Sequence, residues 1–279
     1  MKQLVSIPVK RPQYTMVSGL TFAQVGQWFG HCVRDLKMDL IYPEDKTRRY
    51  PCVVWICGGA WLSMNRSAHM AYLSQLALQG FVVASVEYRT SNEAQFPLPL
   101  EDVKAGIRYL RAHAERFNID PDRIGTMGES AGGYLTAMTA LATDPVFDKG
   151  EYLEYSSRVQ AAVPWYPPTN FAEMQSAKST AASPESLLLG KNVAEHPEEA
   201  EAICPVHYVT KDAPPMMIIH GTSDTTVPFT QGQLLHDRLE KAGCDVTLIA
   251  IEGAEHASLP FFQQEIWDRI VAFFKEKLA

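Results

Sequence analysis

The stretch that decides the fold reads Ile124-Gly125-Thr126-Met127-Gly128-Glu129-Ser130-Ala131-Gly132. Its last five residues form the pattern G-x-S-x-G, with the predicted strand 124–127 before it and a helical pattern after it. A serine on a sharp strand-to-helix turn requires this setting. Such a turn strains the backbone at the serine, and only small residues two positions before and after it avoid a clash. Because both positions hold glycine, Ser130 is predicted to present its hydroxyl above a sheet edge, beside the free N–H groups of the following helix.

Apolar runs and helical patterns alternate on both sides of this stretch. Most of the apolar runs are continuous, as in parallel strands that are buried on both faces, whereas Leu36, Met38 and Leu40 alternate and predict an antiparallel edge strand. The predicted strands cover residues 36–42, 53–57, 81–86, 124–127, 161–163, 216–220 and 247–251. Helices are predicted over 101–117, after Ser130, over 229–242 and over 263–277. This order predicts an α/β fold, a mostly parallel doubly wound sheet with helices on both faces.

The segment 165–205 interrupts the alternation. Six prolines occur from Pro164 to Pro205, with both of these counted, together with an acidic patch and little strand pattern. We interpret it as a helical insertion, a cap or lid over one edge of the sheet, and not as a separate domain. The 279 residues, 46% of them hydrophobic, would allow two domains at about 150 residues each. We nevertheless predict one domain over 1–279, because the candidate site residues need one sheet edge on which to meet.

Composition excludes several classes of protein. Lys and Arg number 25 against 32 Asp and Glu, which gives a net charge of −7. A nucleic-acid partner is not expected, because no basic face is indicated and the short basic cluster 46–49 is typical of a solvated loop. Disordered, collagen-like and disulfide-dense chains have other compositions.

The cysteines and the apolar segments bear on metal sites, compartment and membrane. Five cysteines are an odd number that is ordinary for a reduced cytosolic protein. Neither a C-x-x-C pair nor a zinc-like cysteine and histidine spacing occurs, so we expect no metal and no cofactor. No apolar run approaches the ~18 residues that span a membrane, and the apolar piece 4–9 is too short for a signal peptide. We expect a soluble cytoplasmic protein with no membrane partner; a secretion signal removed beforehand would leave the same pattern. No feature specifies the oligomeric state.

A second glycine-containing turn lies upstream of the serine. Cys57-Gly58-Gly59-Ala60-Trp61 follows the apolar run 53–56. Glycines let the backbone approach a ligand closely and direct N–H groups at an oxyanion. The N–H groups of Gly59, Ala60 and Ala131 are therefore the predicted oxyanion hole. The spacing matches neither a phosphate-binding loop nor a dinucleotide fingerprint.

A nucleophilic serine needs a base, and the base needs an orienting carboxylate. Asp224 follows the predicted strand 216–220, and His256 lies in a loop after the last predicted strand. The chain order Ser130, Asp224, His256 is the order that hydrolase sheets of this kind use. His220 ends a strand and is expected to pack against the sheet, and Asp212 and Asp245 precede strands and so fall at the opposite sheet edge.

These motifs together resemble the α/β-hydrolase family, and more narrowly the small esterases of the bifunctional feruloyl/acetyl-esterase type, which are related to the hormone-sensitive-lipase group. The matching pieces cover nearly all of the chain after about Leu36: 57–61, 86–89, 96–97, 101–103, 128–132, 183–185, 188–190, 219–224, 227–228 and 253–256. The resemblance implies a serine carboxylesterase that acts through an acyl-enzyme on a small ester. Short-acyl or aryl esters are implied, with acetyl or feruloyl esters of plant-derived carbohydrate among them. It also implies a histidine at the position of Cys57, where it acts as a loop brace, so the shape of the oxyanion loop stays open.

Four aromatic residues follow predicted strand ends and are candidates for the substrate pocket: Trp61, Tyr88, Trp165 and Tyr166. Packing in the core is the alternative for each of them. Two other functions also stay open. One is a serine peptidase of the prolyl-oligopeptidase type, although this chain has no room for the propeller domain that such enzymes usually carry. The other is a non-catalytic ligand-binding protein on the same fold, which typically lacks the base that His256 supplies here.

Overall fold

The computed structural model describes residues 1–175 and 180–279. Within these residues eight strands form one sheet: β1 (Tyr14–Gln27), β2 (Cys32–Pro43), β3 (Tyr50–Ile56), β4 (Val82–Val86), β5 (Ile119–Glu129), β6 (Ala161–Trp165), β7 (Met216–Gly221) and β8 (Val246–Ile251). Their order across the sheet is β1-β2-β4-β3-β5-β6-β7-β8. The pairs β1–β2 and β2–β4 are antiparallel and the other neighbours are parallel. The predicted mostly parallel sheet is confirmed.

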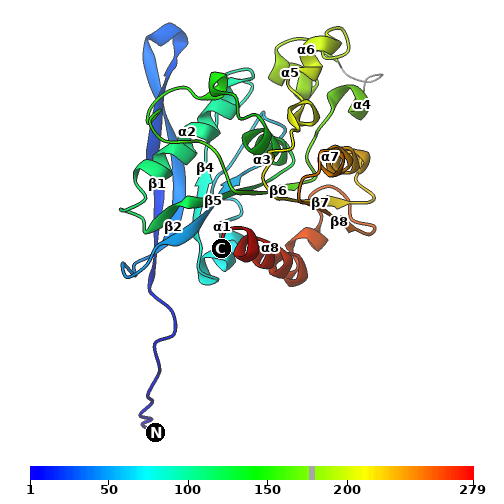
Figure 1. Ribbon diagram of the computed structural model, residues 1–279. Helices are drawn as coiled ribbons and strands as arrows, with labels where there is room; N and C mark the ends of the chain where they lie inside the picture. Colours follow the sequence, from blue (N-terminus) through cyan, green and yellow to red (C-terminus); the bar gives the residue numbers. More distant parts are fainter. Residues whose placement is uncertain (176–179) are drawn as a thin grey trace.

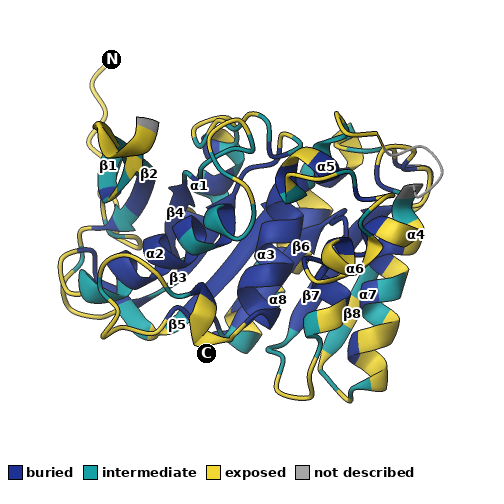
Figure 2. Cartoon of the chain, turned by 90° about the horizontal axis from the view of Figure 1, so that it is seen from above, coloured by how far each residue is buried: buried dark blue, intermediate teal, exposed yellow. Residues whose placement is uncertain are grey.

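Helices cover both faces of the sheet (Figure 1). Five of them form the two outer layers: α1 (Met70–Leu78), α2 (Leu98–Ala112), α3 (Ala131–Leu141), α7 (Thr230–Lys241) and α8 (Gln264–Lys277). Alternate residues of a strand point to opposite faces, so Val53 and Trp55 of β3 pack in the core with α1 and α8. Val54 and Ile56 pack in the core with α2, α3 and α7. Every residue of α3 is buried, which places this helix at the centre of the molecule (Figure 2).

The first strand differs from the sequence prediction. The predicted edge strand 36–42 is antiparallel, as expected, but the longer strand β1 pairs with it and forms the edge instead. The pattern missed β1 because its burial alternates between intermediate and exposed, with Phe22 as its one fully buried residue. The short helix α1 was also not predicted. Its buried residues Met70, Leu73, Leu76 and Ala77 nevertheless recur at helical spacing.

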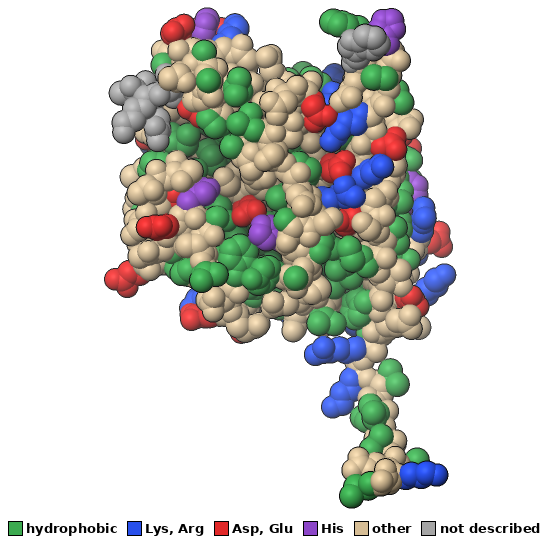
Figure 3. Space-filling model, turned by 180° about the vertical axis from the view of Figure 1, so that it is seen from behind, with side chains coloured by type: hydrophobic (Ala, Val, Ile, Leu, Met, Phe, Trp, Pro, Cys, Tyr) green, Lys and Arg blue, Asp and Glu red, His purple; other side chains and the backbone are tan. Residues whose placement is uncertain are grey.

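Residues 1–10 extend away from the body of the protein and are exposed (Figure 3). The arm carries apolar side chains, among them Leu4, Ile7 and Val9, beside Lys2 and Lys10. Within residues 1–175 and 180–279, every helix is too short or too polar to cross a lipid bilayer.

The segment 165–205 begins with the last residue of β6 and continues through three short helices, α4 (Phe171–Gln175), α5 (Pro184–Leu189) and α6 (Pro197–Glu201). They gather at one end of the molecule, near α3 and α7 (Figure 1). Hydrogen bonds tie the segment to the main body: the hydroxyl of Tyr134 in α3 donates to Ile203 O at 2.7 Å, and Phe96 N–H donates to Leu188 O at 2.9 Å. Residues 176–179 of the predicted insertion lie outside the described residues.

Candidate active site

Ser130 lies on a strained turn between β5 and α3. Its backbone has φ 52° and ψ −121°, a region that non-glycine residues rarely occupy. The turn packs so tightly on β3 that a Cβ atom at Gly132 would lie 2.0 Å from Ile56 O, and one at Gly128 would lie 2.6 Å from the same oxygen. Both glycines of the pentapeptide are therefore required by close backbone packing. The turn leaves the serine hydroxyl at the carboxyl edge of the sheet.

Three side chains that are far apart in the sequence meet at this edge. Nε2 of His256 lies 3.0 Å from Oγ of Ser130, and Nδ1 of His256 lies 2.7 Å from Oδ2 of Asp224. With the Nδ1–H donating to the carboxylate, Nε2 is free to accept the serine proton, which is the arrangement that general-base activation of a hydroxyl requires. The structure therefore brings together all three residues that the sequence indicated.

Asp224 is fixed by several donors. Its Oδ1 accepts the N–H groups of Thr226 at 2.9 Å and Val227 at 2.8 Å. Burial would raise the pKa of Asp224, but hydrogen bonding from His220, His256 and the Val227 N–H outweighs burial and holds that pKa well below its usual range. The carboxylate is thus charged when His256 acquires a proton.

His220 is buried, as expected, and it also approaches the carboxylate of Asp224. Its Nε2–H donates to Val227 O at 2.9 Å, and the same nitrogen lies 3.5 Å from Oδ2 of Asp224. Because Nε2 must donate to a carbonyl, it carries a proton, and the buried Nδ1 meets no partner among the described residues. His220 thus fixes the loop that carries Asp224.

The predicted oxyanion loop follows β3 and has an unusual backbone. Gly59 has φ 121°, and Ala60 and Trp61 have φ 56° and 57°. A Cβ atom at Gly59 would lie 2.0 Å from Ser63 O, so only glycine fits there. Among the residues that the structure describes, no acceptor is recorded for the N–H groups of Gly59 and Ala60. Ala131 opens α3 beside them, where helical N–H groups also lack intrahelical partners.

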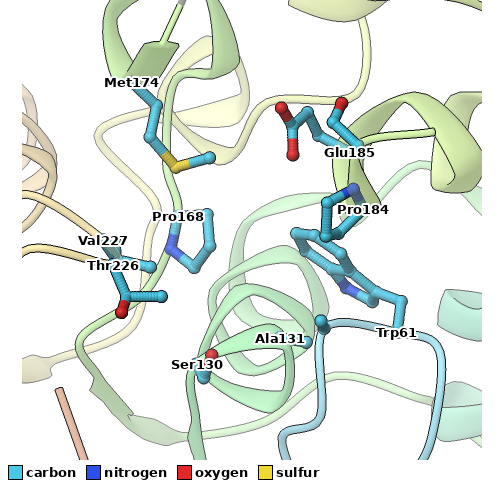
Figure 4. A pocket seen from close by; sticks show the side chains of 11 residues that line it. Trp61, Ser130, Ala131, Pro168, Met174, Pro184, Glu185, Thr226 and Val227 are labelled. Atoms are coloured by element: carbon cyan, nitrogen blue, oxygen red, sulfur yellow. The ribbon is translucent and has the colours of Figure 1, made fainter. Parts of the chain in front are cut away.

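A cavity of about 230 Å³ opens above Ser130. Ser130 and Ala131 lie at its floor, and Trp61 rises beside Pro184 on one side, opposite Met174 and Pro168 (Figure 4). Ala60 also lines the cavity, and its walls come from the chain after β6, from α4 and α5 and from the loop after β7. The remaining lining residues are Ser183, Glu185, Thr226 and Val227. The cavity is therefore narrow, largely apolar and placed directly over the serine hydroxyl.

Of the four aromatic residues predicted to line the pocket, only Trp61 does so. Trp165 points to the opposite core because Ala161, Val163 and Trp165 share one face of β6. Tyr88 is fully buried, and its hydroxyl donates to Cys57 O at 2.9 Å. Tyr166 is also fully buried, behind His256, with 4.5 Å between the ring centroids. The sequence did not assign the wall residues Pro168, Met174, Thr226 and Val227, since no strand-end rule indicates them.

A buried carboxylate lies immediately behind the serine and was not among the sequence candidates. Glu129 accepts hydrogen bonds from His69 and Tyr166. Burial would raise its pKa, but these hydrogen bonds, the charge of His69 and the N–H of Gly58 hold the pKa below its usual value. Cys57 lies 4.0 Å from the same carboxylate, and burial raises the pKa of its thiol. The only sequence signal for this group was the charged residue inside the G-x-S-x-G pattern.

Comparison with known proteins gives consistent results. The profile of the BD-FAE family matches residues 38–239. "Probable carboxylic ester hydrolase LipM" of Mycobacterium tuberculosis is 34% identical over 227 residues, which are 78% of this chain and 50% of that protein. The chain thus spans about half the length of the curated relatives that it matches.

Solved structures also match over nearly the whole chain, and two of them serve as examples. A structure described as a truncated form of a carbohydrate esterase from gut microbiota has a TM-score of 0.85 and 32% identity, and the match covers 96% of this chain and 99% of that one. Esterase 2 of Thermogutta terrifontis, phosphorylated by paraoxon, has a TM-score of 0.70 and 25% identity, with 98% and 96% of the two chains covered. The prediction of an α/β-hydrolase fold is confirmed.

Proposed function

The chain belongs to the BD-FAE family of α/β-hydrolases, and from this premise we propose that it is a serine carboxylesterase acting on short-acyl or aryl esters. The observation that carries the proposal is the continuous path from Asp224 through His256 to Oγ of Ser130, with separations of 2.7 and 3.0 Å, beneath a narrow cavity. The names of its relatives, an ester hydrolase and two esterases, support the same reaction class.

Catalysis follows from the roles that these positions allow. His256 takes the proton of Ser130 as Oγ attacks the ester carbonyl, and it then gives that proton to the departing alcohol. The resulting acyl-enzyme is cleaved when His256 activates a water molecule. Asp224 stabilises the charged imidazole without itself becoming protonated, because its pKa is held low.

We assign to the N–H groups of Gly59, Ala60 and Ala131 the stabilisation of the negative charge that develops on the carbonyl oxygen. These N–H donors lie on a loop and on the first turn of a helix. Close packing holds both rigid, so little reorganisation accompanies the reaction. Removing one such donor typically costs about 10²- to 10³-fold in turnover.

The cavity supports a small substrate group. Its volume of about 230 Å³ is below the roughly 300–1,000 Å³ of pockets for drug-sized ligands. Segment 165–205 contributes Pro168, Met174, Pro184 and Glu185 to its walls, which supports the role of this segment as a cap on one hydrolase domain spanning 1–279. Acetyl or feruloyl esters of carbohydrate fit this description, and the related gut protein is named a carbohydrate esterase.

The thiols support a proposal for the compartment. All five cysteines are free, which suits a reducing environment, and we assign the protein to the cytoplasm on that ground. Localisation of the tagged protein by fractionation tests the assignment, and recovery outside the cytoplasmic fraction contradicts it.

The experiment that tests the function is Ser130→Ala assayed with p-nitrophenyl acetate. Turnover should fall at least about a thousandfold, since nucleophile and base act as a unit. A variant with wild-type turnover removes Ser130 from the mechanism. Paraoxon should add one diethyl phosphoryl group to the wild type and none to the variant, which separates an enzyme from a non-catalytic binding protein. A panel of p-nitrophenyl esters, acetylated sugars, methyl ferulate and a prolyl peptide anilide then separates esterase from peptidase.

A further inference from the structure

Glu129 lies between two parts of the candidate site, the base His256 and the oxyanion loop. The residue directly precedes Ser130, yet its side chain turns into the protein and is 11% exposed. Oε1 lies 2.8 Å from Nε2 of His69, and Oε2 accepts the hydroxyl of Tyr166 at 2.6 Å. Each oxygen of the carboxylate therefore has one strong donor, and the two donors come from different segments of the chain.

The contact between Tyr166 and Glu129 continues to the base His256. The ring of Tyr166 meets the ring of His256 edge to face, with 4.5 Å between centroids and an interplanar angle of 61°. The Tyr166 N–H also donates to Ile219 O at 2.7 Å. Because the hydroxyl and the backbone are both held, the aromatic ring forms a fixed wall against which the imidazole rests.

On its other side, Glu129 supports the oxyanion loop. A Cβ atom at Gly58 would lie 3.2 Å from Cγ of Glu129 and 2.8 Å from its carbonyl oxygen, so loop and carboxylate residue are in close contact. The N–H of Gly58 contributes to the stabilisation of the charged carboxylate. A shift of Glu129 would therefore move the segment that leads directly into Gly59 and Ala60.

His69 is the outermost member of this group and lies outside every motif found in the sequence. It precedes α1, its side chain is 21% exposed, and its ring stacks on Phe262 at 5.4 Å. A carboxylate only accepts hydrogen bonds, so Nε2 carries the proton in this contact. Without that donor, Oε1 would lose its one strong side-chain donor and keep the Cys57 thiol at 4.0 Å, which is a weak donor for a buried carboxylate.

We propose that His69 is a positioning residue for ester hydrolysis: its Nε2–H holds the Glu129 carboxylate between Tyr166 and Gly58, and thereby fixes the base His256 and the oxyanion loop together. This role rests on the proposed esterase function, because both parts that it aligns belong to that mechanism. His69 itself touches neither Ser130 nor the cavity, so it acts only through Glu129.

Two substitutions at the same position distinguish positioning from packing. In His69→Gln the amide nitrogen replaces Nε2 and can still donate to Glu129, whereas in His69→Asn the shorter amide does not reach it. Asn is also a favourable residue at a helix N-terminus, so His69→Asn should keep α1 intact. Both variants lose the imidazole and its stacking on Phe262, and thus they differ mainly in the donor.

The measurements are kcat and KM with p-nitrophenyl acetate, normalised to active sites counted by paraoxon titration, together with thermal unfolding. We expect His69→Asn to lose about tenfold or more in kcat relative to His69→Gln at unchanged KM, since small misplacement of reacting groups costs up to about 10²-fold. The two variants should unfold at similar temperatures. The matched control is the pair His113→Asn and His113→Gln. His113 is partly buried and contacts Tyr109 O in α2, and the two variants should have the same kcat.

Equal kcat values for His69→Asn and His69→Gln, at any level, overturn the proposal. A kcat difference that follows a difference in unfolding temperature also overturns it, because it then reflects packing. Ser130→Ala is assayed in parallel. If it is inactive while the two His69 variants behave alike, the positioning role fails and the esterase function stands; if it is active, the esterase function itself fails.

Discussion

Asp224 and His256 are joined by a hydrogen bond of 2.7 Å between Oδ2 and Nδ1, across 32 residues of sequence. The other carboxylate oxygen is occupied by two backbone N–H groups. The carboxylate therefore cannot rotate without losing several donors, and it sets both the orientation and the tautomer of the imidazole.

Asp224→Asn should lower kcat by about 10⁴-fold, because an amide that keeps the loop contacts favours the wrong imidazole tautomer. The measurement is steady-state hydrolysis of p-nitrophenyl acetate. Asp237→Asn is the matched control, since Asp237 contacts His236 at 3.1 Å on the exposed surface of α7. Loss of activity in the control, or its retention in Asp224→Asn, contradicts the role assigned to Asp224.

The same residue predicts a pH dependence of stability. The pKa of Asp224 is lowered in the folded protein, whereas an aspartate in an unfolded chain has a pKa of about 3.9. A lowered folded pKa adds stability that is complete above the unfolded pKa and is lost as pH falls towards the folded pKa. The free energy of unfolding should therefore fall more steeply below about pH 4 in the wild type than in Asp224→Asn. Denaturant unfolding between pH 7 and pH 3 measures both slopes, and parallel slopes would contradict the prediction.

Gly132→Ala should destabilise the protein because the new methyl group has no room. Its Cβ would lie 2.0 Å from Ile56 O and 2.8 Å from the Cys57 carbonyl carbon, both backbone atoms of β3 and its loop. Overpacking costs about 1–3 kcal/mol where side chains can move, and the loss here should reach at least the upper end of that range. Gly26→Ala is the control, since a Cβ there meets no described atom within 4 Å. A similar free energy of unfolding for the two variants would refute the argument.

The sequence predicted the sheet and the three-residue site because both depend on chain order. Residues that follow parallel strands reach one sheet edge, so Ser130, Asp224 and His256 could be grouped without coordinates. Side-chain direction needs more information. Trp165 occupies a strand end as predicted but faces the core near α8, because it shares one face of β6 with Ala161 and Val163. Its position at the strand end does not by itself indicate which face the side chain takes.

Other features depend on contacts between segments with no shared pattern. His69 reaches Glu129 across 60 residues, and no periodicity in either segment indicates that contact. The edge position assigned to strand 36–42 was wrong for a related reason: β1 is half-exposed, so its residues lack the apolar alternation that signals a strand. Patterns that arise from burial or from chain order are therefore readable, whereas a polar pairing that follows neither, such as that of His69 with Glu129, is not.

Gly59→Ala should reduce kcat by about 10²- to 10³-fold, as expected for a misplaced oxyanion donor. Both the φ of 121° and the separation of 2.0 Å between the new Cβ and Ser63 O force the loop to move. Gly80→Ala is the control, because Gly80 has φ 96° but an added Cβ meets no described atom within 4 Å. Steady-state kinetics should show the loss in kcat for Gly59→Ala alone. Equal kcat values for the two variants would remove Gly59 from the oxyanion hole.

Met174→Ala should shift selectivity towards longer acyl chains. The thioether of Met174 points into the cavity across from Trp61 and Pro184, and the residue is only partly buried, so its truncation enlarges the cavity at small cost in stability (Figure 4). Each additional buried methylene contributes about 0.8 kcal/mol, so the ratio of kcat/KM for p-nitrophenyl hexanoate to that for the acetate should rise severalfold. Met16→Ala, on the half-exposed edge strand β1, should leave the ratio unchanged. An unchanged ratio in Met174→Ala would mean that the acyl group does not enter this part of the cavity, and the alcohol panel would then be repeated on the same variant to locate the leaving group there.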